Sequence, residues 1–448
     1  MTDRPHRRGR RSLIDRRALT ALRHIEYRRI FVASLIVQTG WWLSHISFQA
    51  LMVELTDNDE LQVSLLFFAL FIPVLLVAPV GGLVADRLDR KMIMLWCYAG
   101  MFTGAVTMTA LVATDTITPN LLLLVGLLLG FVFAVLGPAL QATVANSVTA
   151  VDLPSAISLQ ATSINLTRVV GPLVAAPLVA AGLFEAAYAA YAVAAVVAMV
   201  LVSRVRLTPY RRDPDQLSPI ARLAEGVHHA RERQPAVPVL ALTAVLTLLA
   251  VSHIGLLPSF VTEDLGQPEG RFSIVVAATG VGAIVGALSV GSLRSAPTMR
   301  RAGWLGALYA VTLTAFALTE SFVIAVLIQA LAGIFYFAAF TTLQTIIQRV
   351  VDDAKRGRVM SLFQISWAGL VPFGTLALGF TASRPGVGIR TTLVISTLIA
   401  GAVSAGVALV GGRWPAADAY ETSEGSALGG PEPGVEVGDD VVDALEAN

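Results

Sequence analysis

The 448-residue chain has few charged residues, a single cysteine and only two lysines. Charged side chains make up 14% of it, against about 25% in ordinary soluble domains, while 55% of the residues are hydrophobic. This balance excludes a soluble globular protein. The lone cysteine, Cys97, allows no internal disulfide, so we interpret it as a small packing residue and expect no dependence on an oxidising compartment.

The scarcity of lysine also excludes a nucleotide-driven pump. A phosphate-binding loop needs lysine directly after glycine, whereas Lys91 follows Arg90 and Lys355 follows Ala354. The six histidines include no His-Glu-x-x-His zinc pattern, and no nucleophile–base set of an enzyme is evident. We therefore expect no catalytic residues, no cofactor and no metal. Energy for any transport must come from an ion gradient or from the substrate's own gradient.

Twelve apolar windows are long enough to cross a membrane. A bilayer core of about 30 Å needs about 20 apolar residues in a helix, and the mean hydropathy of the chain is +0.71. The predicted fold is therefore an all-α, multi-pass plasma-membrane protein. The predicted spans are 30–53, 63–85, 92–113, 120–146, 156–181, 184–203, 237–260, 272–293, 302–319, 321–348, 358–381 and 391–411.

The positive charges indicate an orientation for these spans. With a cytoplasmic N-terminus, 28 of the 32 Lys and Arg residues fall in cytoplasmic segments. Three fall outside, namely Arg271, Arg384 and Arg390, and Arg168 lies within a span. Because cytoplasmic loops of membrane proteins are enriched in Lys and Arg, this bias predicts an even number of crossings with both termini in the cytoplasm.

Two internal sequence repeats indicate that the chain consists of two related halves. Residues 44–46, Ser-His-Ile, recur at 252–254, an offset of 208. Several residues of the fourth and fifth spans recur at an offset of 203 in the tenth and eleventh, for example Gly171 as Gly374. Such repeats predict two six-helix halves related by an axis along the membrane normal.

The segments outside the halves differ in charge. Residues 1–29 contain ten arginines, of which Arg23, Arg28 and Arg29 are expected to lie on anionic headgroups. Nucleic-acid binding is an alternative that a directly following membrane helix disfavours. An amphipathic stretch at 219–233 is expected at the membrane interface, with a regulatory role as the alternative. From residue 418 the chain has nine carboxylates and no basic residue, which is typical of disorder. The predicted units are a basic arm 1–29, a first half 30–203, a linker 204–236, a second half 237–411 and an acidic tail 412–448.

The stretch 82–91, Gly-Leu-Val-Ala-Asp-Arg-Leu-Asp-Arg-Lys, holds the only cluster of charges for twenty residues on either side. It resembles the loop between helices 2 and 3 of the major facilitator superfamily, G-x3-D-[RK]-x-G-x-[RK]-[RK]. Asp89 stands where the family has glycine, and a type I turn accepts Asp there. The resemblance implies a conformational-switch loop in which Asp86 meets the N-terminal end of helix 11 in one closed state. The residues of this loop are Gly82, Asp86, Arg87, Arg90 and Lys91.

The fifth span contains Asn165-Leu-Thr-Arg168-Val-Val-Gly171-Pro172. This N-x-x-R-x-x-G-P form resembles the helix-5 motif of the superfamily branch that contains enterobactin exporters and macrolide efflux proteins. The Arg356-Gly357-Arg358 stretch before the eleventh span is similar to the same branch. Small residues and proline let a helix pack tightly and bend, and packing alone is the alternative for the Gly-Pro pair.

Arg168 is the only charge well inside a predicted span. An unpaired guanidinium there costs at least ~3 kcal/mol, so it must face a partner, a cavity or water. Two roles stay open: a structural clamp to helix-end carbonyls or polar side chains, and a role in substrate binding or coupling.

Polar residues in the first and seventh spans are candidates for lining a cavity and for proton coupling. Their spacing in the first span predicts a wet face. Family members often have a carboxylate after the helix-1 glycine, whereas tryptophans follow Gly40, so the histidines become the leading titrating groups. Satisfied core histidines are the alternative. The candidates are His45, His253, Glu54 and Gln38.

These features together predict a monomeric secondary transporter that exports a small amphipathic molecule such as a siderophore, antibiotic or drug-like compound. We expect proton antiport by alternating access, with membrane lipids as the other partners and no nucleic acid. The alternatives are an ion-coupled importer or a uniporter of a small metabolite, a membrane enzyme or lipid scramblase, and a non-transporting sensor.

Overall fold

The computed structural model describes residues 16–414 except 88, 207–218 and 293–296, and its secondary structure there is entirely helical. The first half consists of η1 Arg16–Arg23, α1 Ile25–Leu55, α2 Glu60–Arg87, α3 Arg90–Ala113, α4 Pro119–Ala145, α5 Leu153–Ala180 and α6 Phe184–Ser203. The linker forms α7 Pro219–Glu232. The second half consists of α8 Ala236–Leu249, η2 Val251–Leu256, α9 Leu257–Ser259, η3 Phe260–Asp264, η4 Glu269–Arg271, α10 Phe272–Ser292, α11 Met299–Leu318, α12 Phe322–Val350, α13 Asp353–Gln364, η5 Ile365–Gly369, α14 Val371–Ala382, α15 Gly388–Val410 and η6 Gly411–Arg413.

Among the residues that the structure describes, eleven helical segments are long and apolar enough to cross a membrane. Two of them contain breaks: α8 to η3 form one segment, Ala236–Asp264, and α13 to α14 form another, Lys355–Ala382. The predicted span 272–293 coincides with α10, whose described apolar stretch, Phe272–Gly286, is shorter. The all-helical architecture is thus confirmed, and the count of twelve and the orientation of the termini stay predictions.

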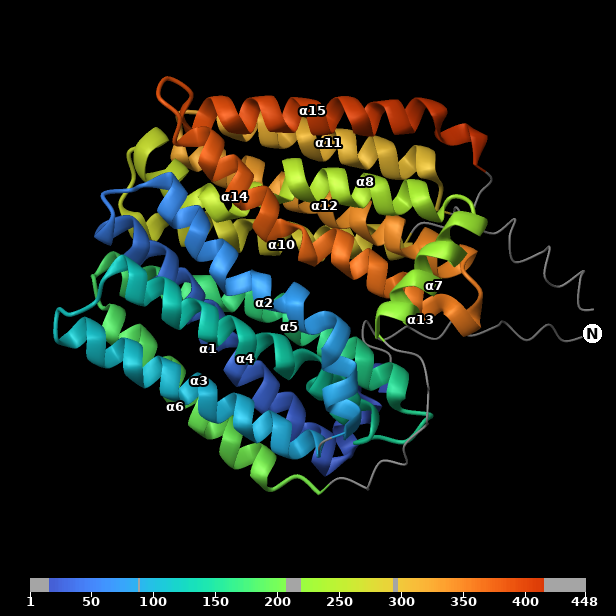
Figure 1. The fold of residues 1–448 in the computed structure, drawn as a ribbon, viewed down its shortest axis with the longest axis horizontal. Coiled ribbons are helices and arrows are strands. Elements are labelled where there is room, and N and C mark those ends of the chain that lie inside the picture. Colours follow the sequence, from blue (N-terminus) through green and yellow to red (C-terminus); the bar gives the residue numbers. More distant parts are fainter. Residues whose placement is uncertain (1–15, 88, 207–218, 293–296, 415–448) are drawn as a thin grey trace, which may run out of the picture.

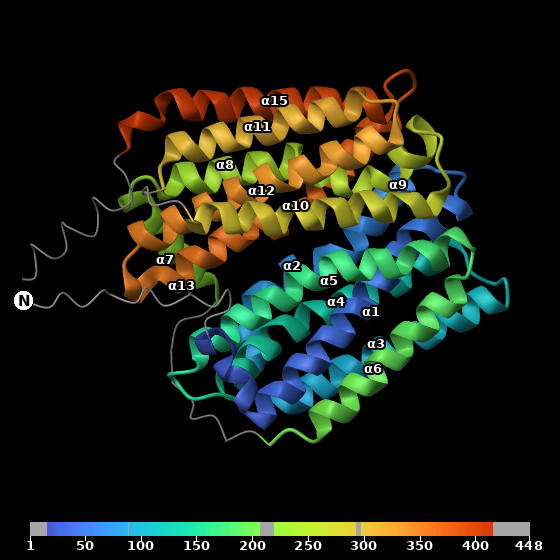
Figure 2. The same ribbon diagram turned by 180° about the vertical axis from the view of Figure 1, so that it is seen from behind.

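The helices form two bundles that lie side by side, α1–α6 in one and α8–α15 in the other (Figure 1). Two helix pairs make contacts between the bundles, α2 with α14 and α5 with α10. We call the end that carries η1, α7 and η6 the basic end, and the end that carries loops 56–59 and 383–387 the opposite end. Seen from both sides, the ribbons of the bundles diverge towards the basic end (Figure 2).

Close helix contacts at two glycines reproduce the internal repeat. A Cβ atom added to Gly171 on α5 would lie 2.3 Å from Trp42 Cβ on α1. A Cβ on Gly374, the repeat partner of Gly171, would lie 2.2 Å from Ser252 Oγ and 2.6 Å from the Leu248 carbonyl oxygen. In each half, therefore, the glycine lets two equivalent helices approach to backbone contact, as small residues do in membrane helices.

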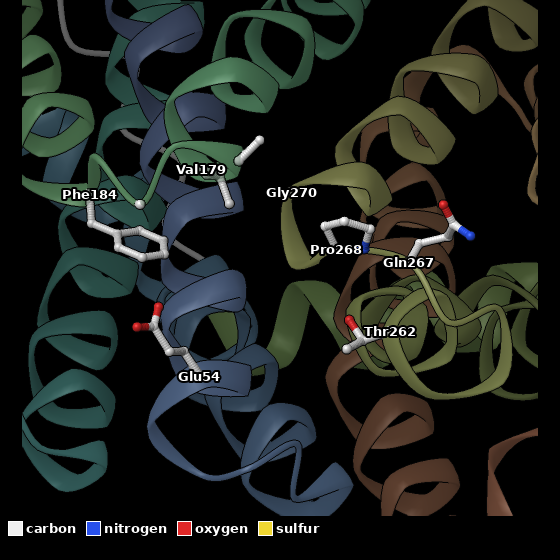
Figure 3. Close-up of a pocket in the computed structure, with 9 residues that line it drawn as sticks. Glu54, Val179, Phe184, Thr262, Gln267, Pro268 and Gly270 are labelled. Atoms are coloured by element: carbon white, nitrogen blue, oxygen red, sulfur yellow. The ribbon is translucent and has the colours of Figure 1, made fainter.

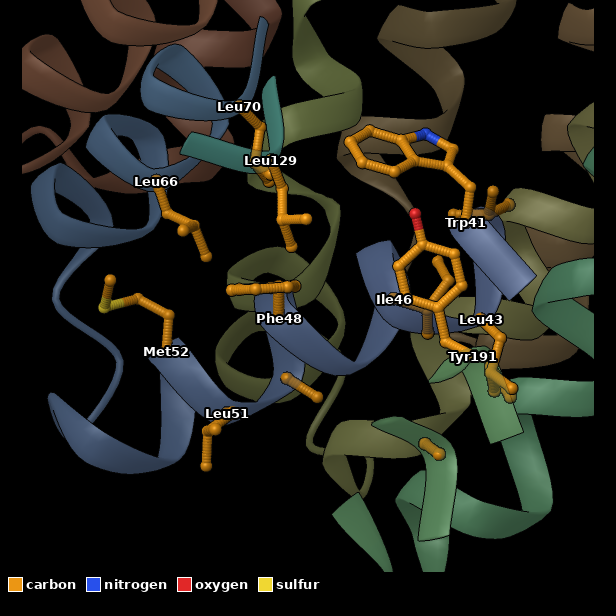
Figure 4. Packing of buried hydrophobic residues seen from close by; sticks show 14 of the residues in the cluster. Trp41, Leu43, Ile46, Phe48, Leu51, Met52, Leu66, Leu70, Leu129 and Tyr191 are labelled. Atoms are coloured by element: carbon orange, nitrogen blue, oxygen red, sulfur yellow. The ribbon is translucent and has the colours of Figure 1, made fainter. Parts of the chain in front are cut away.

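Helix α1 is the centre of the first bundle. Every residue from 43 to 53 is buried, because α2, α4, α5 and α6 all pack around it. Figure 4 shows Ile46, Phe48 and Met52 of α1 among leucines of α2 and α4 and Tyr191 of α6. Within the face predicted to be wet, Trp41, His45 and Gln49 are buried and Gln38 and Trp42 are partly buried, so neighbouring helices cover most of this face.

The described part of the basic arm docks on α5. His24 Nε2 lies 2.7 Å from Asp152 Oδ2, and the Tyr27 hydroxyl donates to the Ala156 carbonyl at 2.9 Å. The His24 hydrogen bond is the largest of the effects that lower the pKa of Asp152 to about 2. Residues 16–29 thus pack against α5 of the first bundle.

The glycine contacts make a testable prediction about packing. Gly171→Ala should lower the free energy of unfolding by about 1–3 kcal/mol, because the new methyl group overpacks against Trp42. Gly137→Ala on α4 is the matched control, since its Cβ would meet nothing within 4 Å. The control should be neutral or more stable by about 0.5–1 kcal/mol. Thermal unfolding in detergent measures both, and equal melting temperatures for the two variants would contradict the packing role.

Candidate functional site

The switch loop predicted at residues 82–91 lies at the basic end, where α2 ends and α3 begins. The backbone of residues 82–87 continues α2 to its last turn. The side chains of Gly82, Asp86 and Arg87 lie outside the described residues. The contact between Asp86 and the N-terminal end of the eleventh predicted span, 358–381, therefore stays a prediction.

The second part of this loop starts α3 and ties it to neighbouring helices of its own half. Asp89 is the N-cap of α3, where its side chain accepts from the Lys91 amide at 2.9 Å, so it begins the helix. Arg90 Nη1 donates to the Ala142 carbonyl at the end of α4. Lys91 Nζ donates at 2.6 Å to the Ser203 carbonyl at the end of α6. Both cations thus lie at helix C-termini, where the dipole favours positive charge.

Arg168 lies on α5 at the boundary between the two bundles. Its Cζ atom is 5.5 Å from the ring centroid of Phe337 on α12 and 6.0 Å from that of Trp367 in η5. Within the described part of the chain it has neither a carboxylate partner nor a hydrogen bond. Two cation–π contacts of about 0.5–2 kcal/mol each can offset the ~3 kcal/mol cost of the charge. They leave the five N–H donors of the guanidinium unused.

Four side chains of the second half make up what we call the aromatic cluster: Tyr336, Phe337, Phe340 and Trp367. Trp367 Nε1 donates to the Tyr336 hydroxyl, and the Trp367 ring packs on Phe340 with centroids 4.5 Å apart. Trp367 occupies the π-helical segment η5, an interruption of the kind that is frequent at functional sites. The cluster is therefore a fixed surface beside Arg168.

The other residues of the helix-5 motif have local roles. Asn165 Nδ2 donates at 2.9 Å to the Ala161 carbonyl of its own helix. Gly171 makes the close contact with α1, and Pro172 is buried beside it. The Gly-Pro pair thus lies in the packing between α5 and α1, whereas the Arg168 side chain faces the second half.

His45 is buried within a ring of aromatic side chains. Its Nε2 lies 3.2 Å from Gln49 Nε2, one turn further along α1. Its Nδ1 is buried without a hydrogen-bond partner among the described residues. The surrounding rings have centroids 5.4–6.3 Å from the imidazole and belong to Trp41, Trp42, Phe67 and Phe71.

His253 is held at both ring nitrogens, which fits the alternative of a satisfied core histidine. Nδ1 lies 2.7 Å from the Ala250 carbonyl, and Nε2 lies 2.8 Å from Gln329 Nε2 on α12. Because the Ala250 carbonyl can only accept, the neutral imidazole carries its proton on Nδ1. Gln329 Oε1 is buried and has no partner in the described structure. Each histidine is thus paired with a glutamine, and Gln329 was missed because sequence spacing does not connect α12 with η2.

The remaining two candidates on α1 lie far from each other. Gln38 Nε2 donates to Ser34 Oγ at 2.6 Å, and Gln160 of α5 donates to the same hydroxyl at 2.9 Å. Glu54 is exposed and lines a pocket of about 440 Å³ at the opposite end. Sixteen residues of helix separate them by about 24 Å. The predicted candidates therefore do not form one site.

Both bundles contribute to the pocket around Glu54 (Figure 3). From the first bundle come the ends of α1, α5 and α6, and from the second come η3 and the chain before α10. A Cβ on Gly270 would lie 2.7 Å from the Ala180 amide nitrogen, so the bundles touch beside the pocket. The other lining residues are Val179, Ala180, Gly182, Phe184, Thr262, Gln267, Pro268 and Gly270.

The 356–358 stretch binds the linker helix. Arg358 Nη1 donates to Glu225 Oε1 of α7, and a Cβ on Gly226 would lie 3.0 Å from the Arg358 carbonyl oxygen. His229 of α7 is buried, with Nε2 3.4 Å from Asp352 Oδ2. The linker helix thus docks on α13, a contact that the sequence did not predict, while Val227 on its predicted apolar face remains exposed.

Comparison with known proteins identifies a matching family, a transporter of similar sequence and solved structures with the same fold. A family model described as transmembrane secretion effector matches residues 16–438. The chain is similar to the Staphyloferrin A transporter of Staphylococcus aureus, with 23% identity over 375 residues that cover 82% of this chain and 92% of the relative.

Solved transporter structures share the fold. A bacterial homologue of the human lysosomal transporter Spinster, inward-facing and unoccupied, superposes with a TM-score of 0.67 at 14% identity, covering 87% of this chain and 97% of that one. A D-xylose–proton symporter superposes with a TM-score of 0.65 at 13% identity, covering 86% and 97%. At these identities the likeness concerns the fold alone.

The docking of the linker helix can be tested by a double-mutant cycle. Glu225→Gln and Arg358→Gln are made singly and together. The coupling free energy between the two side chains should be about 0.5–1 kcal/mol in unfolding, because both are partly shielded from water. The control pair is His228–Glu232 on the same helix, whose side chains are 75% and 53% exposed, and its coupling should be near zero. Chemical unfolding in detergent gives the values. A coupling at Glu225–Arg358 no larger than the control would contradict a specific contact.

Proposed function

Because the chain belongs to the transmembrane secretion effector family of major facilitator transporters, we propose that it exports a small amphipathic molecule across the plasma membrane. It is a multi-pass membrane transporter and not an enzyme. The observation that carries the direction is the family match itself, which extends over residues 16–438 and describes secretion. Similarity to a Staphyloferrin A transporter favours a siderophore among the candidate substrates, with antibiotics and drug-like compounds as the alternatives.

Alternating access is the mechanism that the arrangement of the bundles favours. At the opposite end α1 and α5 both contact η4, so the two bundles meet there. Towards the basic end their ribbons diverge (Figure 2). With the termini in the cytoplasm, as the charge bias predicts, this arrangement is inward-facing. Rocking one bundle against the other about the α2–α14 and α5–α10 contacts would open the other side.

Coupling to protons is supported by the two histidine–glutamine pairs. A glutamine amide can donate to a neutral imidazole and, after rotation, accept from a protonated one. Gln329 Oε1, which has no partner in the described structure, is placed to do this for His253. His45 keeps a free Nδ1 within its aromatic surroundings. We propose that protonation of these imidazoles supplies the coupling charge for antiport.

Transport in everted membrane vesicles tests direction and coupling together. Vesicles acidified inside by respiration should accumulate an exported dye, because outward proton flow drives dye inward in this orientation. Rhodamine 6G and carboxyfluorescein, one cationic and one anionic amphipath, are suitable probes. Nigericin, which collapses the pH gradient, should abolish accumulation. Accumulation that persists without any gradient would indicate uniport, and gradient-driven loss of dye preloaded into the vesicles would indicate import.

The coupling role of the histidines predicts a change in pH dependence. His45→Gln, His253→Gln or the pair should shift the pH profile of dye transport more than it lowers the amount of protein in the membrane, because a titrating group is lost while a hydrogen-bonding side chain remains. His228→Gln is the matched control, since it makes the same substitution at a histidine of the linker helix that is 75% exposed, and it should leave the pH profile unchanged. Unchanged pH profiles in all three variants of His45 and His253 would exclude these histidines from coupling.

A further inference from the structure

Arg168 and the aromatic cluster bring together parts of both bundles at one place. Arg168 belongs to α5, whereas its ring neighbours Phe337 and Trp367 belong to α12 and η5. We infer that Arg168 binds a carboxylate of the transported compound while the aromatic cluster packs on that compound's apolar part. This inference rests on the proposed function, and it names the substrate class as anionic amphipaths.

The inference depends on the guanidinium N–H groups of Arg168, which make no hydrogen bond with the described residues. Ring faces attract the positive charge but accept no directed hydrogen bond of ordinary strength, so the guanidinium edge stays free. The described residues place no carboxylate and no hydrogen-bond acceptor on it. A carboxylate has the planar, two-oxygen geometry that satisfies this edge with two parallel hydrogen bonds. A ligand carboxylate would thus supply what the protein itself does not.

The surroundings of Arg168 add a second polar group and an apolar wall. The Tyr336 hydroxyl accepts from Trp367 Nε1, so its own proton is available to a ligand oxygen. Phe337 and Trp367 form the apolar wall.

Charge then decides which amphipaths are favoured. A cationic compound would meet the guanidinium of Arg168 as a like charge in surroundings of low dielectric constant, where repulsion is strong. A neutral compound of the same shape would keep the aromatic contacts and lose the charge-assisted pair. The order of affinity is therefore anionic above neutral above cationic.

A matched pair of probes tests this order on the intact chain. Naphthalene-2-carboxylate and 2-naphthamide have the same ring and differ in charge, and their binding to the protein in nanodiscs can be measured by calorimetry at neutral pH. Wild type should bind the carboxylate at least tenfold more tightly than the amide. Arg168→Met should bring this ratio close to one, and Arg168→Lys should reduce it at least threefold, because lysine keeps the charge and loses the planar fork.

Two further variants separate the anion contact from general effects. Trp367→Leu should weaken both probes by a similar factor and leave the ratio unchanged. Arg271→Met is the matched control, since Arg271 also lies over a ring, that of Phe322 at 5.6 Å, but at the opposite end. Its ratio should equal that of wild type.

Failure of this inference can be told from failure of the proposed export. Equal affinities of wild type for the two probes, or an unchanged ratio in Arg168→Lys or Arg168→Met, would overturn the carboxylate site. If rhodamine 6G were still transported in vesicles under that outcome, the proposed export would stand and only the carboxylate site would be rejected. A tenfold ratio in wild type that is lost with Arg168, together with no dye transport, would keep the anion site and reject export. The wild-type comparison holds even where Arg168→Met does not fold.

Discussion

The constraint on which this structure depends is that the hydrocarbon core of a bilayer offers no water to its polar groups. Each polar side chain in a span must find a partner inside the protein. Hydroxyls meet this by donating to carbonyls of their own helix, as Thr143 does to Ala139 at 2.7 Å. Each of the two histidines within the spans has a glutamine as a hydrogen-bond partner. Arg168 contacts only the faces of aromatic rings, which stabilise its charge but accept no ordinary hydrogen bond. Arg168, His45 Nδ1 and Gln329 Oε1 are among the described groups for which this requirement is incompletely met, and we propose that they act in transport.

The same absence of water changes what holds the bundles together. Between helices in lipid the hydrophobic effect is small, so close packing has to supply the stability. Gly171 and Gly374 provide it at equivalent places in the two halves. Each bundle is packed within itself and contacts the other through α2–α14 and α5–α10. In the alternating access that we propose, the bundles would move as units about these contacts.

At the basic end, charged side chains make the specific contacts between helices, through hydrogen bonds and an ion pair. Lys91 and Arg90 tie α3 to the ends of α4 and α6 within the first half, and Arg358 ties α13 to the linker helix. None of these contacts joins the first half directly to the second. The motif residues described at this end therefore stabilise each bundle and its attachment to the linker.

Sequence alone determined the helical class, the position of nearly every span and the two-fold repeat, because span length and hydrophobicity are local and are set by the thickness of the bilayer. It also identified Arg168 and the two histidines, since polar residues within apolar runs are visible without a structure. Only the tertiary structure decided what surrounds them. The burial of α1, the partners Gln329 and Trp367, and the docking of α7 depend on contacts between segments far apart in the chain, which no spacing along one helix contains.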